Sequence, residues 1–181
     1  MEYEMDAIAA VDAAWGIGRD NGLLHSIPRD MKFFREMTLG STVILGRRNL
    51  ESFPGGKPLA RRRNIVLSSS LAPGEGYEVC GSLEALFSLL EKTLKEEGSS
   101  RMFVIGGGQV YRQLLPYCRR AYITKMERDF QAEVFFPNLD EDPDWSLAEE
   151  GPALEHQGLI YRFVRYENMR EKDIFRKGSK G

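Results

Sequence analysis

One stretch decides the fold of this chain: Arg101-Met102-Phe103-Val104-Ile105-Gly106-Gly107-Gly108-Gln109-Val110-Tyr111-Arg112-Gln113-Leu114-Leu115. Its first part, Met102 to Ile105, is a continuous apolar run, which is typical of a strand buried on both faces of a parallel sheet. Three glycines follow, and apolar residues then recur at helical spacing, at Val110, Tyr111, Leu114 and Leu115. The stretch therefore predicts a strand, a glycine turn and a helix.

The glycine triplet has two interpretations. Glycines at such a turn let the backbone bend tightly and let a ligand approach the main chain. The free amides at the start of a helix suit a phosphate, and open α/β sheets bind ligands at the carboxyl ends of their strands. Alternatively, the glycines only end a buried strand, because the triplet is not a G-x-G-x-x-G fingerprint. The triplet alone leaves both interpretations open.

Composition narrows the class of protein. The chain has 181 residues, is 42% hydrophobic and carries a formal net charge of -2, which fits one globular domain and lacks the basic imbalance of a nucleic-acid binder. No apolar run approaches the roughly 20 residues of a membrane span, and the acidic N-terminus does not resemble a signal peptide. Two cysteines, Cys80 and Cys118, are expected as free buried thiols in a reducing, cytoplasmic compartment. Two histidines argue against a metal site, and we expect none.

The remaining pattern predicts an α/β fold. Further buried strands are expected at residues 7–11, 42–45, 64–67, 77–80 and 121–126, helices from Pro28, over 49–53 and over 82–96, and antiparallel strands at 145–149 and 159–166. Residues 1–169 then form a single domain with a central, mixed but mostly parallel sheet flanked by helices, and the charged tail 170–181 is expected to be disordered. The loop from Asp12 to Ser26 is long enough to be a lid.

A carboxylate occupies an unusual place in the first helix. Met31, Phe34 and Met37 fall on one helical face, and Asp30 falls on the same face. An acid in the first turn can simply compensate the helix dipole. It can also be a buried acid with a raised pKa that faces a ligand. The sequence around Asp30 does not decide between these two interpretations.

Polar residues follow two of the predicted strands. Arg47 and Arg48 come just after the strand at 42–45, and Ser68 and Ser69 follow the strand at 64–67. Arginines and hydroxyls at one sheet edge can hold a phosphate, although two such arginines are more often solvated surface charges.

Taken together in order and spacing, these motifs resemble those of the dihydrofolate reductases, from Asp6 to Asn168. The resemblance rests on the following stretches: Gly16-Ile17-Gly18; Ile27-Pro28-Arg29-Asp30-Met31-Lys32-Phe33-Phe34-Arg35 with Thr38; Gly46-Arg47 with Glu51-Ser52-Phe53; Arg62 before Asn64-Ile65-Val66-Leu67-Ser68; Ile105-Gly106-Gly107-Gly108 with Tyr111; Thr124; and Phe136-Pro137.

The resemblance implies NADPH-dependent reduction of 7,8-dihydrofolate to tetrahydrofolate for one-carbon metabolism, and sensitivity to antifolates. It makes Asp30 the catalytic acid that orients the pterin and promotes protonation of N5. Arg62, assisted by Lys57, is implied to hold the glutamate carboxylate, and Thr124 to hydrogen-bond Asp30. Pterin and aminobenzoyl contacts are implied for Ile8, Ala9, Ala10, Met31, Phe34, Ile105 and Tyr111.

For the cofactor, the resemblance implies a pyrophosphate site at the glycine turn, a 2′-phosphate site at the two arginines and serines, and a lid over the nicotinamide. The residues implied are Ala10, Gly16, Ile17, Gly18, Arg19, Asp20, Asn21, Gly22, Gly46, Arg47, Arg48, Asn49, Leu67, Ser68, Ser69, Ile105, Gly106, Gly107, Gly108, Gln109, Val110 and Tyr111. We expect a monomer with no nucleic-acid or membrane partner.

The chain departs from the family pattern at a few positions. Leu24-His25 stands where the family usually has Pro-Trp, and Ala60-Arg61 replaces the usual Pro-Gly before the arginine, so Arg61 competes with Arg62 for the carboxylate role. Asn49 replaces a threonine and Glu133 an aspartate. Two other functions remain to be tested: reduction of a phosphorylated pyrimidine or pteridine on the same fold, and non-catalytic nucleotide binding.

Overall fold

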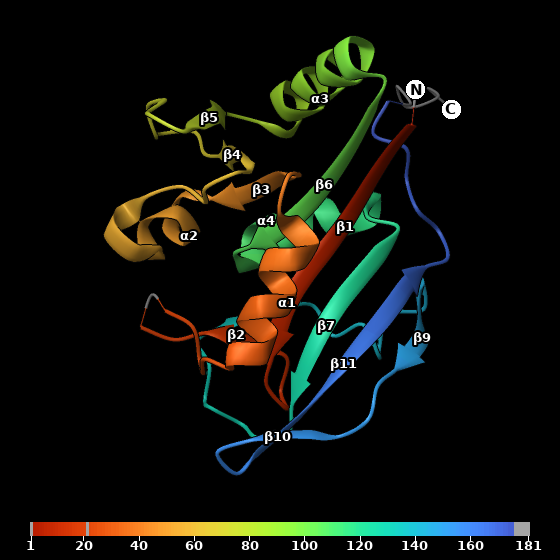
Figure 1. Ribbon diagram of the computed structural model, residues 1–181. Coiled ribbons are helices and arrows are strands. Elements are labelled where there is room, and N and C mark those ends of the chain that lie inside the picture. Colours follow the sequence, from red (N-terminus) through yellow and green to blue (C-terminus); the bar gives the residue numbers. More distant parts are fainter. Residues whose placement is uncertain (1, 21, 176–181) are drawn as a thin grey trace.

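The computed structural model describes residues 2–20 and 22–175, which form a nine-stranded sheet with helices on both faces (Figure 1). The helices are α1 (Pro28–Thr38), α2 (Arg47–Ser52), α3 (Leu83–Glu97) and α4 (Gly108–Leu114), with 3₁₀ turns at Pro54–Gly56 and Leu115–Tyr117. The strands are β1 (Glu2–Val11), β2 (Gly16–Gly18), β3 (Thr42–Gly46), β4 (Arg63–Leu67), β5 (Tyr77–Cys80), β6 (Ser99–Gly106), β7 (Arg120–Met126), β8 (Val134–Phe135), β9 (Trp145–Glu150), β10 (Leu154–His156) and β11 (Leu159–Asn168).

The order of the main sheet is β10-β11-β7-β1-β6-β3-β4-β5, with β9 paired to β11. The strands from β7 to β5 run parallel, whereas β11 pairs antiparallel with β7, β9 and β10. The parallel part is covered on both faces, so its strands are apolar along their length: Ile44, Ile65 and Val104 are fully buried. The predicted mixed, mostly parallel sheet and antiparallel C-terminal strands are confirmed.

The two faces of the sheet have separate cores. On one face α3 and α4 pack against alternate strand residues, which include Met5, Ala7 and Met102. On the other face Phe33, Phe34 and Met37 of α1 and Leu50 of α2 pack against Ile8, Val43, Leu45, Val66, Phe103 and Ile105. Because side chains along β1 and β6 point alternately to the two faces, α1 packs on one face of the sheet and α4 on the other. Both helices begin near the carboxyl ends of the central strands (Figure 1).

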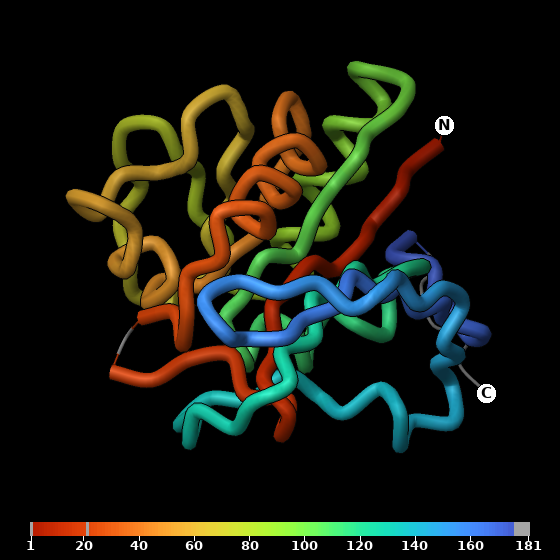
Figure 2. The backbone as a smooth tube through the Cα atoms, turned by 60° about the horizontal axis from the view of Figure 1, so that its bottom comes forward, coloured from red at the N-terminus to blue at the C-terminus, as the bar shows by residue number. Residues whose placement is uncertain are grey.

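Several boundaries differ from expectation. α2 begins at Arg47 rather than Asn49, so both arginines that were expected in a loop lie in the first helical turn. The expected lid loop contains β2, which pairs antiparallel with β8. Figure 2 shows these two segments, far apart in the chain, running side by side. Two short strands in loops rich in glycine and polar residues leave little hydrophobic pattern, and their pairing is a tertiary effect.

The predicted tail divides into two parts. Ile174 is 6% exposed and belongs to the core, and Phe175 packs edge-on against Tyr3 at 5.2 Å between ring centroids. Residues 170–175 therefore lie on the domain rather than forming a disordered extension, because two apolar side chains among the charges supply a contact with β1. Residues 176–181 lie outside the described part of the chain. In the described ranges no helix is long and apolar enough to cross a membrane.

Candidate active site

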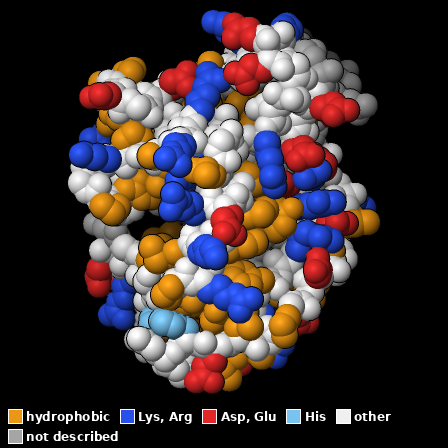
Figure 3. Space-filling model, viewed as in Figure 1, with side chains coloured by type: hydrophobic (Ala, Val, Ile, Leu, Met, Phe, Trp, Pro, Cys, Tyr) orange, Lys and Arg blue, Asp and Glu red, His pale blue; other side chains and the backbone are white. Residues whose placement is uncertain are grey.

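A cleft of about 1720 Å³ runs along the carboxyl ends of the central strands. Its walls come from the ends of β1, β3, β4 and β6, from α1, α2 and the start of α4, and from the lid around β2 with its partner β8. The hollow is visible in Figure 3, with hydrophobic side chains around it. The cleft thus lies where ligands bind in open α/β sheets.

Asp30 lines this cleft from the first turn of α1. Its Oδ1 accepts a hydrogen bond of 2.6 Å from Oγ1 of Thr124 on β7. Burial raises the pKa of the Asp30 carboxyl, while the Thr124 hydroxyl acts in the opposite direction by stabilising the ionised form. No neighbouring positive charge contributes to this balance among the described residues. An acid held in this way keeps its proton to a higher pH than a surface aspartate and has hydrogen-bonding capacity left for a ligand.

The floor of the cleft is apolar. Ile8, Ala9 and Ala10 from β1, Met31 and Phe34 from α1, and Ile105 from β6 all line it, as expected. The hydroxyl of Tyr111 donates a 2.7 Å hydrogen bond to the carbonyl of Ile8. Burial raises the pKa of Tyr111 far above its ordinary value, so this phenol stays neutral. The small side chains of Ala9 and Ala10 leave room for a flat ligand beside Asp30.

The arginines before β4 have different positions. Arg62 lines the cleft, where its Nε donates to the Ala60 carbonyl at 3.0 Å and its Nη1 to Thr38 Oγ1 at 3.4 Å. Burial and the nearby Arg35 guanidinium lower the pKa of Arg62. Arg61 does not line the cleft, and Arg63 is turned to Glu78, with Nε 2.6 Å from Oε2. Of the three arginines, Arg62 therefore faces the site, as expected. Lys57, which was expected to assist Arg62 at the mouth of the pocket, is exposed and does not line the cleft.

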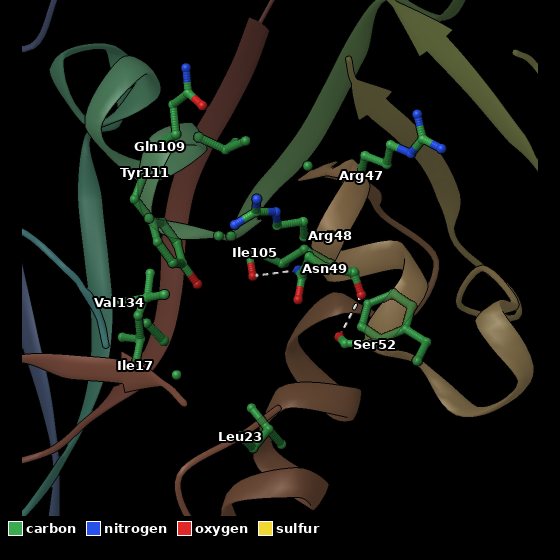
Figure 4. Close-up of a pocket in the computed structure, with 18 of the residues that line it drawn as sticks. Ile17, Leu23, Arg47, Arg48, Asn49, Ser52, Ile105, Gln109, Tyr111 and Val134 are labelled. Carbon is green, nitrogen blue, oxygen red and sulfur yellow. Dashed lines mark hydrogen bonds between the residues drawn. The ribbon is translucent and has the colours of Figure 1, made fainter. Parts of the chain in front are cut away.

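The glycine turn after β6 lies opposite α2. Gly106 has a φ of +113°, and a Cβ there would lie 3.0 Å from the Tyr111 ring, so only glycine fits. Asn49 Nδ2 donates a 3.0 Å hydrogen bond to the Ile105 carbonyl and ties α2 to the turn (Figure 4). In Figure 4 Arg48 extends into the cleft toward this turn, and Arg47 points away from it.

Arg47 is held by two partners outside the turn. Its Nε lies 2.8 Å from Oε1 of Glu51, and its Nη1 donates to Oγ of Ser70 at 3.0 Å. Ser68, Ser69 and Ser70 all line the cleft beside it. The arginine and the serines expected at this sheet edge therefore lie together, and Ser70 is the serine that bonds to Arg47.

The lid is anchored at its base. Trp15, at φ +63°, precedes β2 and stacks on Phe136 with ring centroids 6.0 Å apart, while Nζ of Lys125 lies 4.9 Å from its ring centroid. Ile17, Gly18, Arg19, Asp20 and Gly22 line the cleft, as predicted, whereas Gly16 lies behind them. Asn21 lies outside the described residues.

Comparison with known proteins identifies the family. The dihydrofolate reductase family model matches residues 4–168. The chain belongs to the dihydrofolate reductase family. It is 38% identical over 162 residues to a dihydrofolate reductase of Bacillus subtilis, covering 88% of this chain and 92% of that protein. A second, from Staphylococcus haemolyticus, is 35% identical over 92% of this chain and 97% of its own. A third, from Mycobacterium leprae, is 39% identical over 83% of this chain and 89% of its own. Proteins with this family name are oxidoreductases.

The dihydrofolate reductase motifs do not account for every cleft residue. Sequence reasoning missed Lys32 and Arg35 on α1, Phe53 and Leu59 between α2 and β4, and Leu23, Val134 and Phe135 beside the lid. Arg35 could have been found by its spacing of four residues from Met31, whereas Lys32, two residues after Asp30, has no such signal. Leu23, Phe53 and Leu59 lie in loops, and Val134 and Phe135 form a two-residue strand, so no periodicity shows which way their side chains point.

His25 takes the place of the tryptophan usual in dihydrofolate reductases. Its ring stacks on Phe130 with centroids 5.6 Å apart and lies 6.2 Å from the ring of His156. Its Nε2 is buried without a hydrogen-bond partner among the described residues. His25 does not line the cleft, so it contacts the loop before β8 rather than the ligand space.

Proposed function

We propose that this protein reduces 7,8-dihydrofolate to 5,6,7,8-tetrahydrofolate with NADPH, by hydride transfer to C6 and protonation of N5. The observation that carries the proposal is Asp30: a partly buried carboxyl with a raised pKa, bonded to one hydroxyl, on the apolar wall of a cleft that also contains the glycine turn.

Reduction of a C=N bond requires a hydride on one atom and a proton on the other. Bound NADPH would supply the hydride. Asp30 would accept hydrogen bonds from the pterin's amino group and ring nitrogen through the acceptor capacity that Thr124 leaves free. Because its pKa is raised, the same carboxyl would promote protonation of N5, directly or through a water.

Arg62 is the residue that we assign to the substrate's glutamate. Its guanidinium lies beside Arg35 in the cleft with no carboxylate partner among the described residues, and the resulting repulsion would be relieved by an anion. The planar fork of arginine suits a bidentate carboxylate. Met31, Phe34 and Ile105 would pack on the rings between Arg62 and Asp30. Lys57 would contribute little, because it is outside the cleft.

The opposite half of the cleft fits the cofactor. The Gly106–Gly108 turn would approach the pyrophosphate, since side chains are absent there, and Arg48 points toward it. Arg47 with Ser68, Ser69 and Ser70 would hold the 2′-phosphate, which favours NADPH over NADH on charge grounds. The lid residues from Ile17 to Gly22 would cover the nicotinamide and exclude water. We also propose a cytoplasmic monomer that antifolates inhibit, on the strength of family membership.

The test follows the loss of NADPH absorbance with 7,8-dihydrofolate, across acidic to alkaline pH, with NADH in parallel. We expect turnover with NADPH, much weaker turnover with NADH, and a decline toward alkaline pH as Asp30 ionises. Binding of NADPH without turnover of dihydrofolate would refute the proposal and point to another reductase or a binding module.

A further inference from the structure

Asp12 is a buried carboxylate that the proposed reaction does not use. It is the first residue after β1 and is 2% exposed. Its Oδ1 accepts hydrogen bonds from the amides of Ala14 at 2.9 Å and Gly16 at 2.7 Å, and its Oδ2 accepts one from the amide of Phe130 at 3.0 Å. A charge removed from water in this way is tolerated only because three N–H groups compensate it.

The three donors belong to two different loops. Ala14 and Gly16 are at the base of the lid, and Phe130 is in the segment between β7 and β8, more than a hundred residues later. The same two segments are joined by backbone hydrogen bonds from Ala13 to the Arg128 carbonyl at 3.0 Å and from Glu133 to the Gly18 carbonyl at 2.9 Å. Asp12 is the one side chain among the described residues that bonds to both.

Both loops end at the same part of the cleft. The lid contributes Ile17 and Gly18, and the second loop contributes Val134 and Phe135. β8 also packs on the glycine turn, since a Cβ on Gly108 would lie 2.9 Å from Cγ1 of Val134 and 3.2 Å from the Phe135 carbonyl. The hydrogen bonds of Asp12 to the two loops are therefore connected, through β2 and β8, to the wall of the cleft where we place the cofactor.

We propose that Asp12 is a positioning residue. By bonding to both the lid and the loop between β7 and β8, it holds these two loops in place along the cofactor half of the cleft. This inference rests on the proposed function, because it concerns binding and hydride transfer at the same site. Asp12 touches neither substrate nor cofactor; it acts through the two loops that do.

The two carboxylate oxygens have separate tasks, so asparagine cannot replace aspartate. If the amide oxygen of an Asp12→Asn variant keeps the hydrogen bonds from Ala14 and Gly16, its NH₂ group faces the N–H of Phe130, and two donors then oppose each other. If the amide is flipped, its NH₂ faces the two lid donors instead. Either way one loop is released from the other, although the shape of the side chain is unchanged.

The test measures NADPH affinity and the pre-steady-state hydride transfer rate in Asp12→Asn. We expect NADPH binding at least about tenfold weaker, hydride transfer slowed by a similar factor, and a KM for dihydrofolate that changes little, because lids act on positioning. The matched control is Asp129→Asn in the same loop, whose exposed Oδ1 accepts a 2.7 Å hydrogen bond from Gln131 without contacting the lid. The control should behave as wild type.

A purely structural role predicts a different result. Asp12→Asn would then lower the melting temperature and the active fraction, yet leave NADPH affinity and the hydride rate per active site at wild-type values. That result, in protein folded at the assay temperature, would overturn the inference. If the wild type itself fails to reduce dihydrofolate, the proposed function fails instead, so the two failures are distinguishable.

Gly16→Ala is a second variant that should disturb the contact between the two loops at Asp12. A Cβ there would collide with that of Ala132 and lie 2.9 Å from both carboxylate oxygens of Asp12, so it should separate the loops without changing the charge. We expect the same pattern, with NADPH affinity and hydride rate lowered together. Hydrogen exchange should accelerate at the Phe130 amide in Gly16→Ala, and either at the Phe130 amide or at the Ala14 and Gly16 amides in Asp12→Asn, and at none of these in Asp129→Asn. Wild-type exchange and kinetics in Gly16→Ala would count against the inference.

Discussion

Two carboxyls that face opposite ends of β7, Asp6 on β1 and Asp30 on α1, have very different surroundings. Asp6 on β1 is fully buried near the start of β7, and its oxygens lie 3.2 and 3.3 Å from the guanidinium of Arg119. Asp30 projects toward the other end of β7, where it meets only the hydroxyl of Thr124. Burial raises the pKa of both carboxyls, but only Asp6 has a cation that opposes the rise.

The presence or absence of a cationic partner distinguishes the structural carboxyl, Asp6, from the carboxyl in the cleft, Asp30. Asp6 is neutralised within the protein, so nothing remains for a ligand to provide. Within residues 2–20 and 22–175, Asp30 has no cationic partner and Arg62 in the same cleft has no carboxylate partner. A ligand with a hydrogen-bond-donating ring and an anionic tail would satisfy both groups.

The largest effect is expected from Asp30→Asn. At neutral pH, turnover of dihydrofolate should fall by about two orders of magnitude or more, the scale of a lost general acid, while NADPH affinity is kept. Absorbance kinetics and cofactor titration would measure the two quantities. Asp6→Asn is the matched substitution outside the cleft and should keep wild-type kinetics. Near-normal turnover in Asp30→Asn would mean that the acid is assigned to the wrong residue.

Arg119→Met tests the compensated carboxyl. It leaves Asp6 buried without its cation, so the free energy of unfolding at neutral pH should fall by about 3 kcal/mol in urea denaturation. The pKa of Asp6 is already raised by burial and should rise further in the variant. A group with a raised folded-state pKa stabilises the fold below its unfolded pKa and loses that contribution as pH rises. The deficit should therefore shrink on acidification; an equal deficit at pH 5 and pH 8 would contradict this account.

Arg62→Leu removes the uncompensated cation. We expect the KM for dihydrofolate to rise by roughly 30-fold, about 2 kcal/mol, which is typical of a lost charged hydrogen bond, with kcat changed much less. Arg61→Leu is the neighbouring control and should leave the KM near wild type, because Arg61 does not line the cleft. If Arg61→Leu raises the KM instead, the glutamate site is misplaced by one residue.

The smallest effect is expected from Thr124→Val. The Thr124 hydroxyl stabilises ionised Asp30, so its loss should raise the pKa of Asp30 further. Activity that needs the protonated acid should then persist to higher pH, so the alkaline limb of the kcat/KM profile should move to higher pH. The change in kcat/KM at neutral pH should be smaller than the loss expected for Asp30→Asn or Arg62→Leu. A shift toward acid would mean that the hydroxyl acts on the protonated form.

The sequence predicted the parts of this structure that periodicity determines. The apolar run before Gly106 predicted β6, and the helical spacing of Asp30 with Phe34 placed the acid on the face of α1 that lines the cleft. Arg62 was expected in the cleft from its motif, and the structure places it there, while its role remains a prediction.

Other features could not be read from local pattern. β2 and β8 are short, and their pairing depends on where two loops meet after the sheet has formed. The bond from Phe130 to Asp12 joins residues more than a hundred positions apart and has no local signal. Lys57 was expected to assist at the mouth of the cleft; glycines at 55 and 56 with φ of +67° and +63° turn the chain before it, and its exposed side chain does not line the cleft. Ile174 and Phe175 were hidden among charges that favour disorder.

The packing of Trp15 makes the base of the lid optically visible. The chain contains two tryptophans, Trp15 and Trp145, and only Trp15 adjoins the lid. With Trp145→Phe, all tryptophan emission would come from an indole stacked on Phe136 with the Lys125 ammonium over its ring. Reduced nicotinamide absorbs where tryptophan emits, so energy transfer from this single fluorophore would report cofactor arrival, and its emission wavelength would report any opening of the stack, in one stopped-flow trace without an added label.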